Sequence, residues 1–165
     1  ITNMSGERMP STPAVLALRA AKVEFTPHFY EYEEKGGTAV SSRELKVDEH
    51  AVVKTLVMAD DKAAPLIVLM HGDRKVSTKA LARIIGVKSV EPCTPDTAQR
   101  HSGYRVGGTS PFGTRKKMPV YVERSILDMP AIFINGGSRG FLVKIAPGVL
   151  TELLAAKPVD VAIAQ

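Results

Sequence analysis

Two apolar runs that stand close together in the sequence constrain the fold more than any other feature. Residues 54–58 and 66–70 are dominated by Val, Leu, Ile and Met, and the polar turn Asp60-Asp61-Lys62 separates them. Apolar runs of this length around a polar turn predict an antiparallel hairpin buried in a sheet. Further strands are expected at residues 24–32, 119–123, 131–135 and 141–145.

Short helices are expected between these strands. A hydroxyl residue followed by proline starts one helix at residues 13–22 and another that runs from Pro95 to near Gly103, because the hydroxyl caps free amides and proline suits the first turn. A helix at residues 78–85 ends at Gly86, since glycine takes the left-handed conformation there. Other helices are expected at residues 41–46, 49–53 and 147–155.

These elements predict a single compact α/β domain at residues 11–165, preceded by a flexible leader at residues 1–10. A chain of 165 residues is long enough for one sizeable core. The elements are short, and hairpin-like connections join several strands. We therefore expect a mixed, mostly antiparallel sheet with surrounding helices, and not a doubly wound parallel sheet.

Composition favours a cytoplasmic protein with a polyanionic partner. Lys and Arg total 22 against 17 for Asp and Glu, which gives a net charge of +5 and a pI near 9.4. Such a surplus favours nucleic acid, although many proteins that bind none also carry it. The single cysteine, Cys93, excludes an internal disulfide. No apolar run reaches the ~18 residues that cross a bilayer, and residues 1–10 do not resemble a signal peptide.

Two glycine-rich segments are candidate ligand loops. In residues 103–113, Gly107 and Gly108 would let backbone amides approach a ligand, and Pro111 would stiffen the turn. The basic residues 115–117 that follow suit phosphate contacts, although a solvated surface turn is the better interpretation of the segment on its own. The second segment, residues 135–140, reads on its own as a simple hairpin turn.

Lys54 interrupts an otherwise apolar stretch. A partly buried ammonium group needs a partner or a function, and binding a phosphate, a ribose or an ester carbonyl would each provide one. The alternative is a buried stem with the charge held in water. Both interpretations stay open at this point.

Familiar catalytic sets are missing from the sequence. Cys93 has no flanking pattern of a thiol nucleophile, and Ser110 has no histidine close in sequence. The four histidines are scattered without the spacing of metal ligands, so we expect no metal site. A hydrolase built on this chain would therefore lack an obvious nucleophile of its own.

A set of motifs in a fixed order resembles the YbaK/EbsC family, freestanding relatives of the editing domain inserted in bacterial prolyl-tRNA synthetases. The resemblance covers about residues 11–156. The residues that carry it are Thr12-Pro13-Ala14, Phe25, His28, Tyr30, Lys54-Thr55-Leu56, Gly103-Tyr104, Val106-Gly107-Gly108, Ser110-Pro111, Gly113, Gly136-Gly137, Arg139-Gly140 and Ile145-Ala146-Pro147.

The resemblance implies a deacylase for cysteinyl-tRNA that carries the proline anticodon. The family's pocket lysine matches Lys54, its pocket tyrosine matches Tyr30, and its glycine loop would enclose the terminal adenosine and the aminoacyl ester. The substrate-binding residues implied are Tyr30, Thr55, Gly107, Gly108, Thr109, Ser110, Pro111, Asn135, Gly136 and Gly137.

The mechanism that the resemblance implies is substrate-assisted. The thiol of the substrate cysteine attacks its own ester carbonyl, while the protein orients the ester and supplies amides to the oxyanion. This agrees with the missing protein nucleophile. No cofactor is expected, and the expected partners are aminoacyl-tRNA and, transiently, prolyl-tRNA synthetase.

Three departures from the family pattern leave the amino-acid specificity open. Asn135 stands where serine is usual, Ser138 where lysine is usual, and Leu142 where a polar residue is frequent. Sister branches clear alanyl-tRNA or other small aminoacyl-tRNAs, and a non-catalytic tRNA- or nucleotide-binding module is a third hypothesis. Every version of the editing hypothesis requires the ammonium group of Lys54 to face the amides of residues 107–111 across a small cleft.

Overall fold

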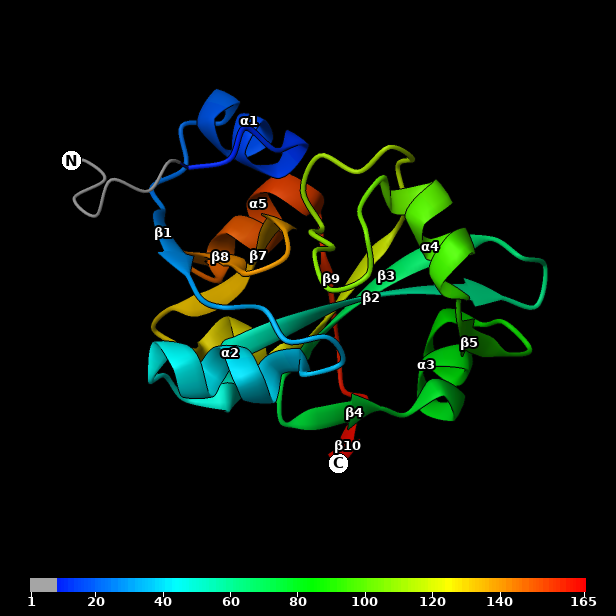
Figure 1. The fold of residues 1–165 in the computed structure, drawn as a ribbon. Helices are drawn as coiled ribbons and strands as arrows, with labels where there is room; N and C mark the ends of the chain where they lie inside the picture. The colour runs from blue at the N-terminus through cyan, green and yellow to red at the C-terminus, as the bar shows by residue number, and fades with distance from the viewer. Residues whose placement is uncertain (1–8) are drawn as a thin grey trace.

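A sheet of eight strands runs through the computed structural model, which describes residues 9–165 (Figure 1). Most of the expected leader at residues 1–10 therefore lies outside the described residues. The strand order is β1-β8-β7-β2-β3-β6-β9, β5 also pairs with β2, and a separate two-stranded sheet joins β4 and β10. The bounds are β1 Thr26–Phe29, β2 Val52–Asp60, β3 Pro65–His71, β4 Arg74–Val76, β5 Val90–Pro92, β6 Val120–Glu123, β7 Ile132–Ser138, β8 Phe141–Ile145, β9 Lys157–Val159 and β10 Ala162–Ala164.

The mixed, mostly antiparallel sheet expected from the sequence is confirmed. β2 pairs antiparallel with β3 and β5, and β8 pairs antiparallel with β1 and β7. The pairs β2–β7, β3–β6 and β6–β9 are parallel. The predicted hairpin is the longest pairing in the sheet, and its register sets Val53 opposite His71 and Ala59 opposite Pro65.

Alternation along β2 gives the sheet two differently packed faces. Val53 and Val57 belong to the main core, whereas Met58 belongs to a second cluster and Val52 to a third. Side chains of successive strand residues point to opposite faces, which explains this division. The face of each residue on β2 therefore determines which part of the site it can reach.

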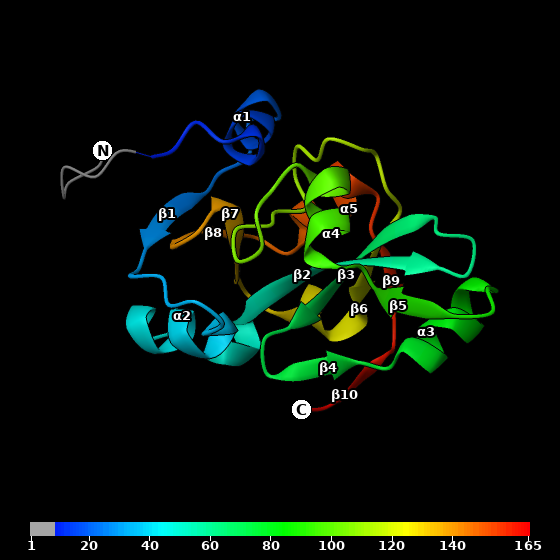
Figure 2. The same ribbon diagram turned by 45° about the vertical axis from the view of Figure 1, so that its right-hand side comes forward.

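Helices cover both faces of the sheet (Figures 1 and 2). Side chains of α1, α4 and α5 pack on the main core, and those of α3 pack on the second cluster. None of the helices in residues 9–165 has the length and apolar character of a membrane span. The bounds are α1 Pro13–Ala20, α2 Gly37–Leu45, α3 Thr78–Ile85, α4 Pro95–Ser102 and α5 Gly148–Leu154, with 3-10 turns η1 Glu49–Ala51 and η2 Arg124–Asp128.

Helix ends that carry a cap signal lie close to where the sequence predicts them. The hydroxyls of Thr12 and Thr94 accept hydrogen bonds from amides in the first turns of α1 and α4. Gly86 and Gly103 end α3 and α4 in the left-handed conformation, with φ of 77° and 84°. The ends of these helices therefore follow from hydrogen bonds and backbone conformations of residues at the ends themselves.

Some expected elements differ in extent. The helix expected at residues 41–46 begins earlier, as α2 at Gly37–Leu45. The strand expected at residues 24–32 is paired only over Thr26–Phe29, because β8 begins at Phe141, the partner of Phe29. The helix expected at residues 49–53 is a single 3-10 turn, since Val52 already hydrogen-bonds in β2 beside β7. The short strands β4, β5, β9 and β10 were not expected at all, and each of them has three residues.

Candidate functional site

The fold packs the two glycine-rich segments against each other. The side-chain amide of Asn135 donates to the backbone oxygen of Gly107 at 3.2 Å, and Nε of Arg139 donates to the oxygen of Val106 at 2.8 Å. A Cβ on Gly108 would lie 2.9 Å from the backbone of Ser138 and Arg139. The two turns, nearly 30 residues apart in sequence, thus form one structure.

Glycine is required where these turns touch their neighbours. Gly107 has φ of 88°, and a Cβ on it would lie 2.5 Å from the hydroxyl of Tyr32. Gly137 has φ of 105°, and its Cβ would lie 2.8 Å from Thr12. Side chains are excluded at both positions by conformation and by space, so bare backbone forms the walls of the site.

The segment of residues 103–113 is braced from inside. The hydroxyl of Tyr104 donates to the oxygen of Phe112 at 2.6 Å, and the hydroxyl of Ser110 accepts from the amide of Phe112 at 3.1 Å. Burial raises the pKa of Tyr104 to about 12, so this hydroxyl keeps its proton at neutral pH. Ser110 is fully buried and Pro111 is buried too, whereas Thr109 is half-buried. Among the expected loop contacts, Gly107 is exposed and Gly108 is buried, so Gly107 is the most accessible.

Lys54 lies one strand away from Asn135 on the same face of the sheet. The parallel register of β2 and β7 pairs Val52 with Phe133 and Val53 with Ile134, and Lys54 and Asn135 are the next residues along the two strands, just beyond the last pair. Val52 and Phe133 share the third cluster, and alternation places the next-but-one residues on that same face. Because Asn135 also bonds to Gly107, it links the strand beside Lys54 to the first glycine turn.

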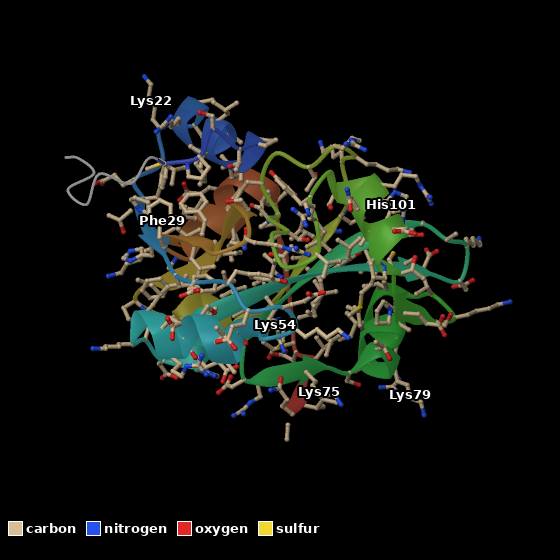
Figure 3. The ribbon with its side chains drawn as sticks, in the orientation of Figure 1. Lys22, Phe29, Lys54, Lys75, Lys79 and His101 are labelled. Carbon is tan, nitrogen blue, oxygen red and sulfur yellow. The ribbon has the colours of Figure 1, made fainter. Side chains whose placement is uncertain are left out.

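The ammonium group of Lys54 is held between β2 and β4 (Figure 3). It donates to the backbone oxygen of Arg74 and, at 3.2 Å, to the side-chain oxygen of Gln165. Burial lowers the pKa of Lys54, and the negative charges of Glu49 and Asp73 oppose this shift. Within residues 9–165 its hydrogen bonds run to β4 and to Gln165, and none joins it to the amides of residues 107–111, which the editing hypothesis requires it to face.

Tyr30 and Thr55 lie on opposite faces. Tyr30 packs against the third cluster, on the face of Lys54, and its amide donates to the oxygen of Gly140 at 3.0 Å. Burial raises its pKa. Thr55 follows the alternation of Val53 and Val57 toward the main core, and its buried hydroxyl has no hydrogen-bond partner in the described structure. Tyr30 therefore lies on the same face of the sheet as the lysine, whereas Thr55 does not.

A cluster of His50, His71 and Asp73 adjoins Lys54, although the histidines look unrelated in sequence. Nδ1 of His50 bonds to Asp73 at 2.8 Å, and its ring stacks on His71 with centroids 3.6 Å apart. The hairpin register could have revealed this cluster, because pairing Val53 with His71 brings residues 50 and 73 together.

This cluster is held together by hydrogen bonds. Candidate ligand atoms of the three side chains lie within 4.8 Å of one another. The two nitrogens of His71 already bond to the oxygen of His50 and to Ser125, both at 2.7 Å. Burial lowers the pKa of His71, which favours the neutral ring. A metal ion would have to replace these bonds between stacked rings, so the arrangement fits a bracing network better than a metal site.

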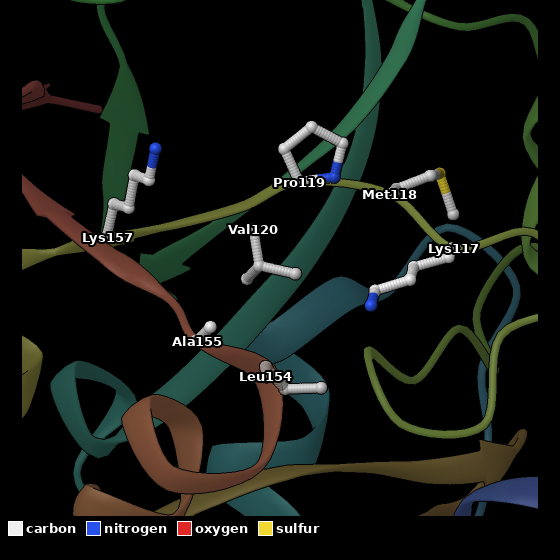
Figure 4. A pocket seen from close by; sticks show the side chains of 7 residues that line it. All are labelled: Lys117, Met118, Pro119, Val120, Leu154, Ala155 and Lys157. Carbon is white, nitrogen blue, oxygen red and sulfur yellow. The ribbon is translucent and has the colours of Figure 1, made fainter.

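Among the hollows on the surface of residues 9–165, two differ in their lining. One, with a volume of about 460 Å³, lies between the two glycine turns and is lined by Tyr104, Arg105, Gly108 and Arg139 among others. The other, of about 350 Å³, has Val120 and Leu154 on its floor and Lys117 and Lys157 on either side (Figure 4). Only the first hollow includes residues of the expected site.

Comparison with known proteins gives the family. The aminoacyl-tRNA editing domain family matches residues 33–153, which is most of the chain. The chain belongs to this family. EbsC of Enterococcus faecalis, named as a proposed Cys-tRNA(Pro)/Cys-tRNA(Cys) deacylase, is 29% identical over 143 residues, covering 86% of this chain and 87% of EbsC.

Other similar proteins are a longer enzyme that matches over one segment and a solved structure that matches over its whole length. Proline–tRNA ligase of Levilactobacillus brevis is 30% identical over 92 residues, which is 55% of this chain and 16% of the ligase. A solved structure described as a proposed trans-editing enzyme for prolyl-tRNA synthetase shares the fold, with a TM-score of 0.81 at 20% identity, covering 96% of this chain and all of that one. The resemblance to the YbaK/EbsC family is therefore confirmed, and aminoacyl-tRNA editing is the activity of the family.

Proposed function

We propose that this protein removes cysteine from mischarged Cys-tRNA(Pro) as a freestanding deacylase. The observation that carries the proposal is the link between the strand of Lys54 and the first glycine turn: Asn135, next along β7 after the residue paired with Val53, bonds to exposed Gly107. Membership of the editing family and the similarity to EbsC support the class of substrate.

The proposed reaction uses the substrate as its own nucleophile. The cysteine sulfur attacks the ester carbonyl carbon, the bond to the ribose 3′-oxygen breaks, and that oxygen takes the thiol proton. The products are tRNA with a free 3′-hydroxyl and a cyclic thiolactone. The protein orients the ester and stabilises the developing oxyanion.

Each residue has a separate task in this proposal. Lys54 leaves its bond to Gln165 and holds the ester or the adenosine end through a charge-assisted hydrogen bond. Gly107 and Gly108 supply amides close to the ligand, and Tyr30 lines the pocket on the lysine side. Asn135 acts mainly as a brace, because both ends of its side-chain amide already bond to Gly107 and Gly137.

A discharge assay with Cys-tRNA(Pro) tests the proposal. Lys54→Met keeps the apolar stem but removes the charge, and we expect it to lower kcat/KM at least a hundredfold. Lys79→Met, on the exposed surface of α3, is the matched control and should discharge tRNA at the rate of the unaltered protein. Full activity of Lys54→Met would refute the role of the lysine.

A specific observation favours alanine as a second candidate side chain. Leu142 is buried with Val52 and Phe133 in the cluster that holds Tyr30, so an apolar wall adjoins the proposed pocket. Side-by-side discharge of cysteinyl-, alanyl- and seryl-tRNA(Pro) separates the two. Selective loss of the cysteinyl ester supports the thiol mechanism, whereas faster loss of the alanyl ester requires a water nucleophile.

The proposed protein partner is prolyl-tRNA synthetase, which generates the mischarged tRNA. The similarity of this chain to a segment of proline–tRNA ligases supports the shared substrate. Affinity capture of the synthetase in the presence of tRNA(Pro), and its loss after ribonuclease treatment, is the expected result. Capture that does not depend on tRNA would instead indicate a direct protein complex.

A further inference from the structure

The charged side chains that line the hollow between the two glycine turns are all positive. Arg105 and Arg139 are the charged residues that line it, and none of its described lining residues is acidic. Within residues 9–165, neither arginine forms an ion pair with a carboxylate. Two unneutralised guanidinium groups beside a cavity of about 460 Å³ indicate an anionic ligand.

Arg139 is held in place before any ligand arrives. Its Nε donates to the oxygen of Val106 at 2.8 Å, and its guanidinium carbon lies 4.9 Å from the centre of the Tyr32 ring. A guanidinium group has five N–H donors, so this single bond leaves the forked end free for a ligand. Because the side chain is already ordered, binding an anion there costs less conformational entropy.

The glycine turns that wall the hollow pack too closely to their neighbours to admit a side chain. A Cβ on Gly108 would collide with residues 138 and 139, and a Cβ on Gly137 would lie 3.0 Å from Tyr104, the buried floor. The turn that forms one wall is also bonded through Gly107 to Asn135, the residue that follows Ile134, the β7 partner of Val53. The turn therefore connects the hollow to the part of the sheet that carries Lys54.

We propose that this hollow is a phosphate subsite, in which Arg105 and Arg139 bind the phosphodiester backbone that precedes the 3′-terminal nucleotide of the tRNA. The assignment rests on the proposed function, in which Lys54 holds the ester or the terminal adenosine and the phosphate lies between this adenosine and the preceding nucleotide. Planar guanidinium groups match the oxygens of a phosphodiester in pairs.

Binding of uncharged tRNA(Pro), measured by fluorescence anisotropy at several KCl concentrations, tests the subsite. Arg105→Ala should weaken binding on the order of threefold to tenfold and reduce the slope of log K against log salt by about 0.7, the value for one single-strand phosphate contact. Arg139→Ala should behave alike. The control is Arg124→Ala. Arg124 lies on η2 and pairs with Asp160, and its replacement should change neither quantity.

A second RNA locates the contact. On tRNA(Pro) that lacks its last three nucleotides, Arg105→Ala should bind as tightly as the unaltered protein, since the contacted phosphate is gone. An unchanged salt slope with full-length tRNA, or an equal loss of affinity on the truncated tRNA, would overturn the proposal. Neither measurement involves ester cleavage, so a failed discharge assay would refute the proposed activity and leave this test independent.

Discussion

Neighbouring side chains on one strand of this protein point either toward the proposed site or into the main core. Alternation along β2 places Lys54 on the face of Tyr30 and Asn135, and it turns Thr55 toward the main core. The resemblance to the YbaK/EbsC family marks Lys54 and Thr55 alike, because it compares sequence and not orientation. Orientation assigns them different tasks.

Replacing Thr55 by Val should stabilise the protein. The buried hydroxyl has no partner in the described structure, and an unsatisfied buried polar group costs about 1–3 kcal/mol. Valine has nearly the same shape and a higher strand propensity. Thermal unfolding of Thr55→Val should shift upward by about 2–4 °C per kcal/mol gained, with the discharge rate preserved. Lower activity at an unchanged Tm would instead show that the hydroxyl contacts substrate.

Asp73 should act on Lys54 through the neighbouring residue Arg74. Its bond to His50 holds the start of β4, and the next residue, Arg74, supplies the oxygen that accepts from Lys54. Asp73→Ala should therefore lower kcat about tenfold at unchanged KM for tRNA. Asp160→Ala, which also removes an exposed carboxylate from an ion pair, should leave kcat unchanged. A loss of activity that only follows a lower Tm would contradict positioning.

The same carboxylate makes stability depend on pH with a defined sign. Partial burial raises the pKa of Asp73, but the hydrogen bond and charge of His50 together with Arg74 hold it below its ordinary value of 3.8. Ionised Asp73 therefore stabilises the fold above pH 3.8, and this contribution is lost as pH falls through the lower folded value. The Tm difference between the unaltered protein and Asp73→Asn should shrink between pH 5 and pH 2, on the order of these pKa values. A constant difference would contradict the pairing.

At the scale of elements, predictability follows how local the signals are. α3 and α4 have their cap residues within a few positions of their ends, and sequence predicts both closely. β9 and β10 have three residues each and owe their pairing to β6 and β4, more than 30 and 80 positions away. The contact between the glycine turns is equally non-local. Family resemblance predicted that both turns belong to the site, but only the fold shows that Asn135 joins them.

The C-terminal segment should depend on one buried carboxylate. Oε1 of Glu123, a buried residue, accepts hydrogen bonds from the amides of Val161 and Ala162 at 2.8 and 3.0 Å. Hydrogen bonds to a charged group are worth about 1.5–3 kcal/mol. Glu123→Ala should therefore speed amide exchange at residues 161–164, while Glu123→Gln, which keeps an acceptor oxygen, should protect them partly. Equal protection in both variants would show that β4 alone holds β10.

At the scale of the whole molecule, several positive side chains lie at and near the glycine turns. The net charge of +5 by itself says little about partners. The positions of the charges say more. Arg105 and Arg139 line a hollow, and the segment that follows it exposes Arg115, Lys116 and Lys117. A long-range field of this sign steers a polyanion toward the site before any specific contact forms.

Salt should therefore weaken substrate capture more than catalysis. Raising KCl from 50 to 200 mM should lower kcat/KM for aminoacyl-tRNA by on the order of tenfold, because neutralised phosphates release counterions on binding. kcat should stay nearly constant, since the ester contacts form inside the site, where salt screens poorly. The matched substrate is an aminoacyl-adenosine without phosphate, whose kcat/KM should barely respond to salt. An equal response of both substrates would place the salt effect on the protein fold, because only the tRNA carries the charges that the field attracts.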